Sequence, residues 1–241
     1  MNEIEKSKYE DCEQCKEAAK MAFKMEFSRL FSNFHLDIRA TSCMPADSIG
    51  LFSLWHGDIA NQKFHEVIVC PVNRHFSNGA GVSAALFRKD GEMMSDALQR
   101  AQMAYNSQKD KTDFVISVVP VKSERIKTTA ICFVAVDDTM EEFSQFDNLY
   151  DLYFNIIKTL LYKTSYESVI FPLIGTGAGG VPITISAEAA MEAFTKFKRK
   201  KDMHPLSVVL LGRDENAYNL MQNASHFCAY KSMVTNLLYS L

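Results

Sequence analysis

Short apolar runs alternate with amphipathic segments along most of this chain, and this alternation predicts its secondary structure. The apolar runs are rich in valine and isoleucine, as in buried strands. Predicted strands cover Leu51–Trp55, Glu66–Pro71, Phe114–Val121, Thr129–Val136, Ser168–Leu173 and Leu206–Leu211. Predicted helices cover Gly81–Phe87 with its continuation, Ser95–Asn106, Phe143–Leu161, Ile185–Lys198 and Asn216–Tyr230. The pattern favours an α/β fold, with one mixed sheet and helices on both of its faces.

The beginning of the chain follows a different pattern. Residues 3 to 33 contain no glycine or proline, which predicts a long helix or a helical hairpin. Apolar residues recur there at helical spacing: Phe23, Phe27, Leu30, Phe31 and Phe34. We expect this stripe to pack on the main domain, and docking of a partner or an oligomer mate is the alternative. We therefore assign an N-terminal helical extension to residues 1–47 and one α/β domain to residues 48–241.

Composition limits the kind of protein this is. The chain is 47% hydrophobic and 23% charged, as is ordinary for a globular protein, and its formal net charge of −3 gives no strong signal for nucleic acid. No apolar stretch approaches the ~20 residues that span a bilayer, and the N-terminus does not read as a signal peptide. The six cysteines are scattered, and Cys12 and Cys15 form a lone CxxC without a second pair. We therefore expect a cytoplasmic or nuclear protein with no membrane partner, no metal site and no cofactor.

The segment Ile170–Pro182, IFPLIGTGAGGVP, is the most informative stretch for chemistry. An apolar run ends in four closely spaced glycines, and an alanine-rich segment of helical character follows. Strand, glycine loop and helix together bring backbone N–H groups close to a phosphate. The spacing matches neither GxGxxG nor GxxxxGK[ST], so dinucleotide-fold and P-loop interpretations gain no support. Taken alone, such a loop is equally compatible with a structural turn.

A second loop repeats this arrangement earlier in the chain. The apolar run EVIVCPV leads into Asn73 and then into the small-residue tract Ser77–Phe87. Further upstream, Asp58 follows Gly57 at the end of a third apolar run. Three strand ends that carry small or polar residues suit one ligand crevice at the carboxyl edge of a sheet.

Taken together, these segments resemble the macrodomain family, whose members bind ADP-ribose and its derivatives. The resemblance rests on four motifs in order, GDI, VIVCPVN, GAGV and FPLIGTGAGGVP, and covers roughly residues 48 to 235. It implies a three-layer α/β/α architecture. The ligand-binding residues that it implies are Asp58, Ile59, Asn73, Gly79, Ala80, Gly81, Val82, Gly175, Thr176, Gly177, Ala178, Gly179, Gly180 and Arg213.

The resemblance also implies a role for each part of the site. The two glycine loops would clamp the diphosphate, Asp58 would accept a hydrogen bond from the adenine amine, and Asn73 would lie beside the distal ribose. Ordinary turn roles are the alternatives: a cap for Asp58 and an Asx-turn for Asn73. The adenine-stacking position falls at Leu210–Arg213, where no aromatic residue stands. Stacking there would be aliphatic or would use the Arg213 guanidinium plane.

The sequence leaves open whether this protein catalyses a reaction. Many hydrolytic macrodomains carry an aspartate just after the first glycine loop, and this chain has Ser83 there, a weak base. The loop looks closer to that of the terminal ADP-ribose glycohydrolase branch, but Asp137 and Gly179 stand where that branch uses lysine and aspartate. Candidate catalytic residues are Asn73, acting with an ordered water, and His75 or Asp137 as acid–base groups. A histidine or an aspartate near a strand end is also commonly an ordinary hydrogen-bonded loop residue.

Three functions are therefore compatible with the sequence. The first is a module that binds ADP-ribose, a derived nucleotide or an ADP-ribosylated protein. The second is a mono-ADP-ribosyl hydrolase that cleaves a glycosidic or an ester bond. The third is an interaction protein with a vestigial crevice, in which the phenylalanine-rich N-terminal helix is the working surface.

Overall fold

The computed structural model describes residues 52–62, 65–73, 75–77, 79–107, 115–135, 145–177, 179–197 and 205–239. The predicted N-terminal extension with its phenylalanine stripe, the domain boundary at residue 48 and the CxxC pair lie outside the described residues. The candidate site residues Asp137 and Ala178 also lie outside them. None of the helices in the described ranges is both long and apolar enough to cross a bilayer.

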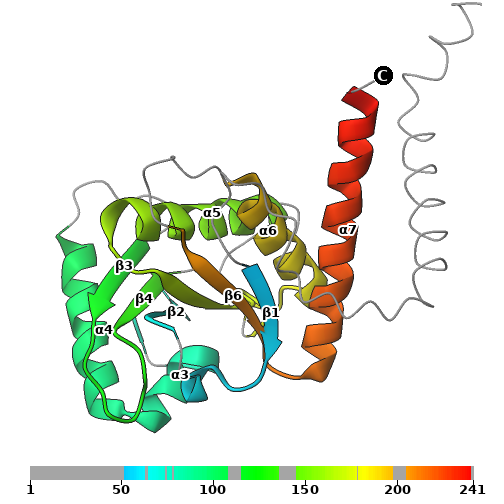
Figure 1. Cartoon of the computed structure of the whole chain (residues 1–241). Coiled ribbons are helices and arrows are strands. Elements are labelled where there is room, and N and C mark those ends of the chain that lie inside the picture. The colour runs from blue at the N-terminus through cyan, green and yellow to red at the C-terminus, as the bar shows by residue number, and fades with distance from the viewer. Residues whose placement is uncertain are drawn as a thin grey trace, which may run out of the picture. The chain divides into compact units, whose positions relative to one another are not determined.

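Six strands form one mixed sheet in the described part of the chain (Figure 1). They are β1 (Phe52–His56), β2 (Val67–Val72), β3 (Val115–Pro120), β4 (Ala130–Ala135), β5 (Ser168–Pro172) and β6 (Ser207–Gly212). Their order is β1-β6-β5-β2-β4-β3, and every neighbouring pair is parallel except β3 and β4. The predicted strands are confirmed, with small shifts at their ends.

The predicted helices are also present, with small shifts at their ends and two larger changes in their bounds. They are α3 (Gly81–Lys89), α4 (Gly91–Asn106), α5 (Gln145–Lys163), α6 (Ile183–Lys196) and α7 (Glu215–Tyr239). Helix α4 begins before the predicted Ser95 because the Asp90 carboxylate caps it, accepting from the Met93 N–H at 3.2 Å. Helix α7 runs to Tyr239 and not to Tyr230. A short 3-10 helix, η1 (Ile59–Asn61), was not predicted, because three residues are too few to show a periodic pattern.

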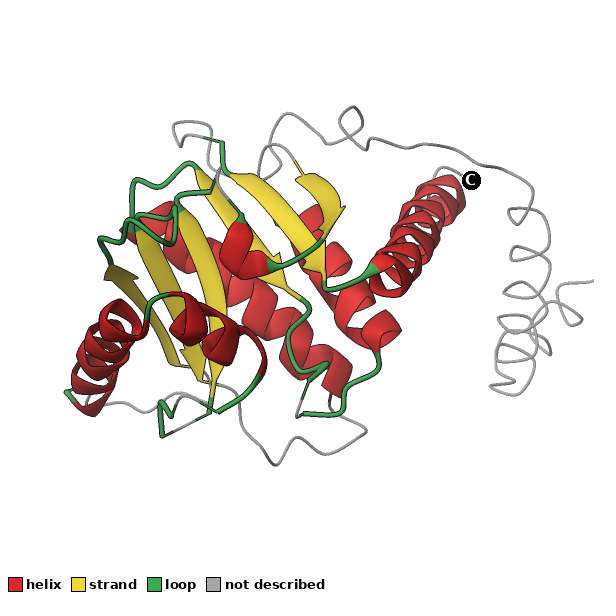
Figure 2. Cartoon of the chain, turned by 90° about the horizontal axis from the view of Figure 1, so that it is seen from below, coloured by secondary structure: helices red, strands yellow, loops and turns green. Residues whose placement is uncertain are grey.

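Helices cover both faces of the sheet, which makes the three-layer α/β/α architecture (Figure 2). Side chains alternate between two hydrophobic clusters along β2: Val67 and Val69 join the cluster under α5, α6 and α7, whereas Ile68 and Cys70 join the cluster under α3 and α4. A sheet buried on both faces needs apolar side chains at nearly every strand position. This explains why the predicted strands are continuous apolar runs.

The two buried cysteines of the central strands lie on opposite faces of the sheet. Cys70 belongs to the cluster under α3 and α4, and Cys132 on β4 belongs to the other cluster. Burial raises the pKa of both thiols, that of Cys132 to about 12. Both thiols are therefore protonated at neutral pH, and they are not placed to form a disulfide with each other.

Candidate functional site

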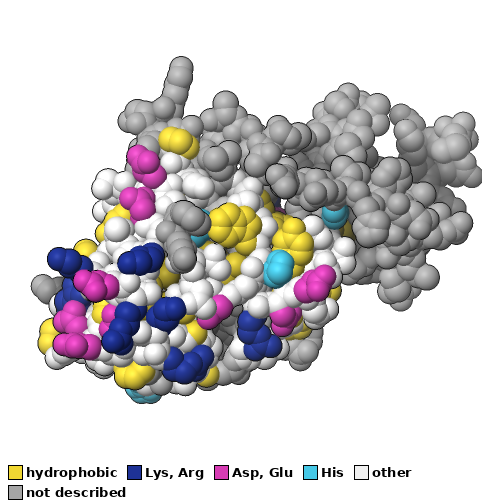
Figure 3. Space-filling model, turned by 60° about the horizontal axis from the view of Figure 1, so that its bottom comes forward, with side chains coloured by type: hydrophobic (Ala, Val, Ile, Leu, Met, Phe, Trp, Pro, Cys, Tyr) yellow, Lys and Arg dark blue, Asp and Glu magenta, His cyan; other side chains and the backbone are white. Residues whose placement is uncertain are grey.

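The carboxyl ends of the parallel strands bring together the loops that the sequence singled out. Asp58 follows β1, Arg213 follows β6, the second glycine loop follows β5, and Asn73 follows β2. Since these strands run in the same direction, all four segments emerge at one edge of the sheet. Figure 3 looks onto the lower side of the molecule, toward which β1 points in Figure 1. Acidic and basic side chains are interspersed there beside a group of hydrophobic ones.

The two glycine loops diverge from neighbouring strands. β2 and β5 pair directly, yet the chain after β2 enters α3 on one face of the sheet and the chain after β5 enters α6 on the other. A point where connections leave adjacent strands toward opposite faces opens a crevice at the carboxyl edge of an α/β sheet. The two loops therefore flank the point of divergence, which is where this rule predicts a ligand crevice.

Both helices that follow the glycine loops begin without a side-chain cap. Ala80 is the N-cap of α3 and Pro182 is the N-cap of α6, and neither makes a side-chain hydrogen bond to the helix. In contrast, Asp90 caps α4, and Asp214 accepts from the Ala217 N–H in the first turn of α7 at 2.9 Å. The first N–H groups of an uncapped helix lack an internal acceptor and attract anions. Two such helix ends therefore face the carboxyl edge.

The second glycine loop has a shape that its own backbone bonds define. The Val181 N–H donates to the Gly175 carbonyl at 3.0 Å, and the Gly180 N–H donates to the Gly177 carbonyl at 3.1 Å. Gly175 has a φ of +82°, and a Cβ built there would lie 2.7 Å from Cγ2 of Val181. A Cβ on Gly179 would lie 2.8 Å from the Gly175 carbonyl oxygen. The loop itself therefore requires glycine at 175 and 179.

Gly177 and Gly79 differ from the other glycines that the structure describes. Neither has a positive φ, and a Cβ built on either meets no heavy atom within 4 Å. Each therefore has room for a side chain, and neither needs the left-handed backbone conformation that favours glycine. One of the two lies in each glycine loop, where it leaves the backbone without a covering side chain.

Asp58 caps the short helix η1. Its carboxylate accepts from the Ala60 N–H at 3.0 Å and from the Asn61 side-chain amide at 2.8 Å. The neighbouring Ile59 is buried in the core beneath it. The capping role is therefore present in the structure, and the exposed carboxylate retains further acceptor positions for a ligand.

Asn73 forms the turn that carries the start of the first loop. Its side-chain oxygen accepts from the N–H groups of His75 at 3.1 Å and Ser77 at 3.0 Å, and its amide donates to the Ser77 hydroxyl at 2.6 Å. This is the Asx-turn alternative. One amide hydrogen remains for a water or a ligand. His75 is exposed on the same turn.

Arg213 and Ser83 differ strongly in their access to solvent. The Arg213 side chain is 92% exposed and lies 3.6 Å from the Asp214 carboxylate. Ser83 is 2% exposed and lies against β2, where it hydrogen-bonds to Cys70. The Ser83 hydroxyl therefore faces the core, which removes it as a base toward a ligand in this conformation.

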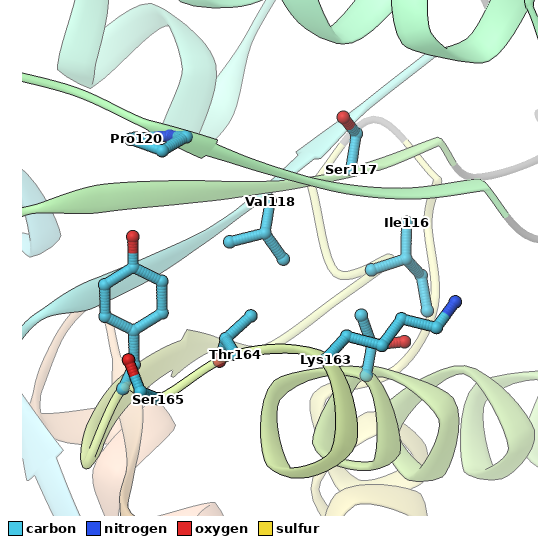
Figure 4. Close-up of a pocket in the computed structure, with 9 residues that line it drawn as sticks. Ile116, Ser117, Val118, Pro120, Lys163, Thr164 and Ser165 are labelled. Carbon is cyan, nitrogen blue, oxygen red and sulfur yellow. The ribbon is translucent and has the colours of Figure 1, made fainter.

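A separate groove of about 480 Å³ lies between the edge strand β3 and the end of α5 (Figure 4). Ile116 and Val118 point from β3 toward Lys163 and Thr164, whereas Ser117 points away. The segment that closes the groove leads into the amino end of β5, so the groove lies at the opposite edge from the glycine loops. It is distinct from the candidate site.

His65 is a buried histidine whose two ring nitrogens have no hydrogen-bond partner among the described residues. Its ring lies 5.3 Å from the Trp55 ring. Burial lowers the pKa of His65 below the ordinary value of 6.5. The folded state therefore disfavours the protonated form, while the unfolded chain binds a proton once the pH falls below about 6.5.

We expect His65 to make folding stability depend on pH. Between pH 6.5 and the lower folded-state pKa, the unfolded state binds more protons, so wild-type stability falls with decreasing pH, by up to about 1.4 kcal/mol per pH unit. His65→Phe keeps an aromatic ring beside Trp55 and removes this titration. Urea unfolding of both proteins at pH 7.5 and pH 5 measures the difference. If the free energy of unfolding changed equally with pH in both proteins, His65 would not be the source of the pH dependence.

Comparison with known proteins identifies relatives of this chain. The model of the family described as "Macro domain" matches residues 69–190. The O-acetyl-ADP-ribose deacetylase of Citrobacter koseri is 28% identical over 167 residues, which is 69% of this chain and 90% of that protein. The enzyme of the same name from Escherichia coli K12 is 26% identical, over 67% of this chain and 88% of that protein.

Solved structures share the fold at lower sequence identity. A mutant of the Oceanobacillus iheyensis macrodomain with ADPR has a TM-score of 0.61 and 23% identity, covering 74% of this chain and 94% of that chain. The Trypanosoma brucei macrodomain in complex with ADP has a TM-score of 0.56 and 18% identity, covering 72% and 68%. At these identities the structural matches establish the arrangement of strands and helices.

Proposed function

Because this chain belongs to the macro domain family, we propose that it binds ADP-ribose, a nucleotide derived from it or an ADP-ribosylated protein, through its two glycine loops. The observation that carries the proposal is the pair Gly79 and Gly177. Neither backbone conformation nor a contact with a described heavy atom requires glycine at these positions, and one lies in each loop beside an uncapped helix end. Backbone N–H groups left bare in this way suit a diphosphate.

The order of the strands matches the order of the groups in this ligand. Along the carboxyl edge, the ends of β1 and β6 carry Asp58 and Arg213, the ends of β5 and β2 carry the two glycine loops, and Asn73 also follows β2. Adenine would lie at the first pair, the diphosphate between the loops, and the distal ribose beside Asn73. Three strand spacings of about 4.8 Å separate β1 from β2 and give this edge a length of roughly 14 Å.

Isothermal titration calorimetry with ADP-ribose tests the proposal. We expect a single site, with ADP retaining part of the affinity and adenosine much less, because the loops bind phosphate groups. The emission of Trp55, the only tryptophan in the chain, offers an independent readout near Asp58. The absence of binding at millimolar ADP-ribose would instead support a vestigial crevice in an interaction protein.

Ester hydrolysis is a second candidate function, because the relatives from Citrobacter koseri and Escherichia coli are named O-acetyl-ADP-ribose deacetylases. In this reaction water adds to the acetyl carbonyl carbon, the ester C–O bond breaks, and acetate and ADP-ribose leave. Asn73 has one amide hydrogen left to orient that water, and His75 and Asp137 remain candidate acid–base groups.

Acetate release from O-acetyl-ADP-ribose separates the binding module from the hydrolase. A binding module releases no acetate above the uncatalysed rate. For a hydrolase, we expect Asn73→Ala to lower kcat by about tenfold or more. Asn73→Asp is the matched variant, because it keeps the acceptor for the His75 and Ser77 N–H groups and loses the amide donor.

The two Asn73 variants distinguish a catalytic amide from a structural one. Loss of activity in both variants, with ADP-ribose affinity kept, assigns the amide to catalysis. Activity retained in Asn73→Asp and lost in Asn73→Ala shows that Asn73 acts only through the turn. Activity unchanged in both removes Asn73 from the reaction. Binding to a protein that carries an ADP-ribosyl group stays a prediction. The cytoplasmic or nuclear location of this protein also stays a prediction.

A further inference from the structure

Two buried hydroxyl groups lie beneath the start of the second glycine loop. Tyr153 comes from α5 and Ser186 from α6, two helices that pack together over one face of the sheet (Figure 1). Both side chains are fully buried. The Tyr153 ring contacts Phe171 and Phe194, so its surroundings are otherwise apolar. No sequence pattern singles out this pair, because both residues fall inside helical apolar patterns.

The two hydroxyls bond to the backbone from which the loop starts. The Ile174 N–H donates to the Tyr153 oxygen at 2.8 Å, and the Ser186 hydroxyl donates to the Ile174 carbonyl at 2.8 Å. The Tyr153 oxygen lies 2.9 Å from the Ser186 oxygen and 3.3 Å from the Pro172 carbonyl, so its single proton has an acceptor. We call these two residues the loop brace.

The loop brace sits where the backbone leaves the sheet. β5 ends at Pro172, so Ile174 is beyond the ladder of strand hydrogen bonds while still fully buried. A buried N–H or carbonyl without a partner is costly, and the brace supplies partners for both groups of Ile174. Gly175 follows directly. The brace therefore fixes the position and direction in which the loop begins.

The loop brace stays intact over the physiological pH range. Burial raises the pKa of Tyr153 to about 12, and its hydrogen bonds with the Ser186 hydroxyl and the Ile174 N–H oppose this rise. The hydroxyl is therefore neutral wherever the protein functions.

We propose that Tyr153 and Ser186 are positioning residues, which hold the second glycine loop so that its N–H groups converge on the diphosphate of the ligand. This inference rests on the proposed function. Hydrogen bonds from backbone N–H groups to an anion depend strongly on direction, so a loop whose first residue is loose binds the diphosphate less well.

Calorimetry with ADP-ribose on Tyr153→Phe and Ser186→Ala tests the loop brace. We expect each variant to bind about five- to tenfold more weakly than wild type. We also expect the double variant to bind little worse than either single variant, because the two groups act as a unit. Phe194→Leu is the control. It perturbs the same buried cluster and contacts the Tyr153 ring, but bonds to nothing in the loop.

If Tyr153 and Ser186 only stabilised the fold, the binding measurements would give different results. All affinities are measured at a temperature where each variant is folded by circular dichroism. Equal weakening in Phe194→Leu, or wild-type affinity in both brace variants, would overturn the inference. Binding of adenosine, followed by NMR shifts, is expected to be unchanged in the brace variants, because adenosine has no phosphate. Equal weakening for adenosine and ADP-ribose would likewise overturn it.

Hydrogen exchange separates failure of this inference from failure of the proposed function. If wild type does not bind ADP-ribose, the proposed function fails. The amides of residues 174–181 then still report on the brace, since Tyr153→Phe is expected to speed their exchange relative to Phe194→Leu. Unchanged exchange at these amides would show that the brace does not hold the loop.

Discussion

ADP-ribose affinity is expected to fall by at least about a hundredfold in Gly177→Val, with the fold retained. Gly177 has no positive φ, and a Cβ built there meets no described heavy atom within 4 Å. The fold can therefore accept a valine, and we expect the free energy of unfolding to change by less than about 1 kcal/mol. The added methyl groups would instead occupy the opening between the two loops, where the diphosphate is proposed to lie.

Calorimetry on variants with side chains of increasing size at position 177 tests this prediction. Gly177→Ala is the matched control, since it adds one methyl group at the same position and should weaken binding less than valine does. Gly81→Glu is a poorer choice, because Gly81 has a φ of +63° and any side chain there strains the backbone. Full affinity in Gly177→Val would place the ligand elsewhere and would remove the main support for the proposed function.

Gly175→Ala is expected to reduce the free energy of unfolding by about 2–4 kcal/mol, the largest stability effect that we predict for the site. Two causes add. An alanine at a φ of +82° costs about 1–2 kcal/mol, and its Cβ would lie 2.7 Å from Cγ2 of Val181. Val181 is buried and its N–H bonds to the Gly175 carbonyl, so it has little freedom to move aside.

A double variant separates these two causes. Val181→Ala in the Gly175→Ala background removes the overlap and leaves the cost of the backbone conformation. We expect part of the stability to return, measured as a coupling energy from urea unfolding of the two single variants and the double variant. Strictly additive effects would mean that the overlap is relieved without cost. Unchanged stability in Gly175→Ala would show that the loop adopts another shape.

The opposite behaviour of Gly175 and Gly177 illustrates the limit of the sequence. Both stand in one motif, GTGAGG, and the pattern treats them alike. The backbone dihedral at Gly175 and its distance from Val181 mark it as a structural glycine, whereas the open space at Gly177 leaves it available for the proposed ligand site. The same holds for Asp58 and Asn73, whose caps and turn bonds were alternatives that the sequence left open.

Local patterns were sufficient for the strands and the longer helices that the structure describes. Strands, helices and glycine loops depend on residues near one another in the chain, so apolar periodicity and turn chemistry predicted them. The pairing of the strands and the packing of the helices decided how these elements are arranged. Residues 67 and 169 are neighbours across β2 and β5, which brings the two glycine loops to adjacent strand ends. Tyr153 reaches Ile174 and Ser186 only after α5 and α6 pack. Such contacts join distant segments, and no local periodicity encodes which buried hydroxyl meets which carbonyl.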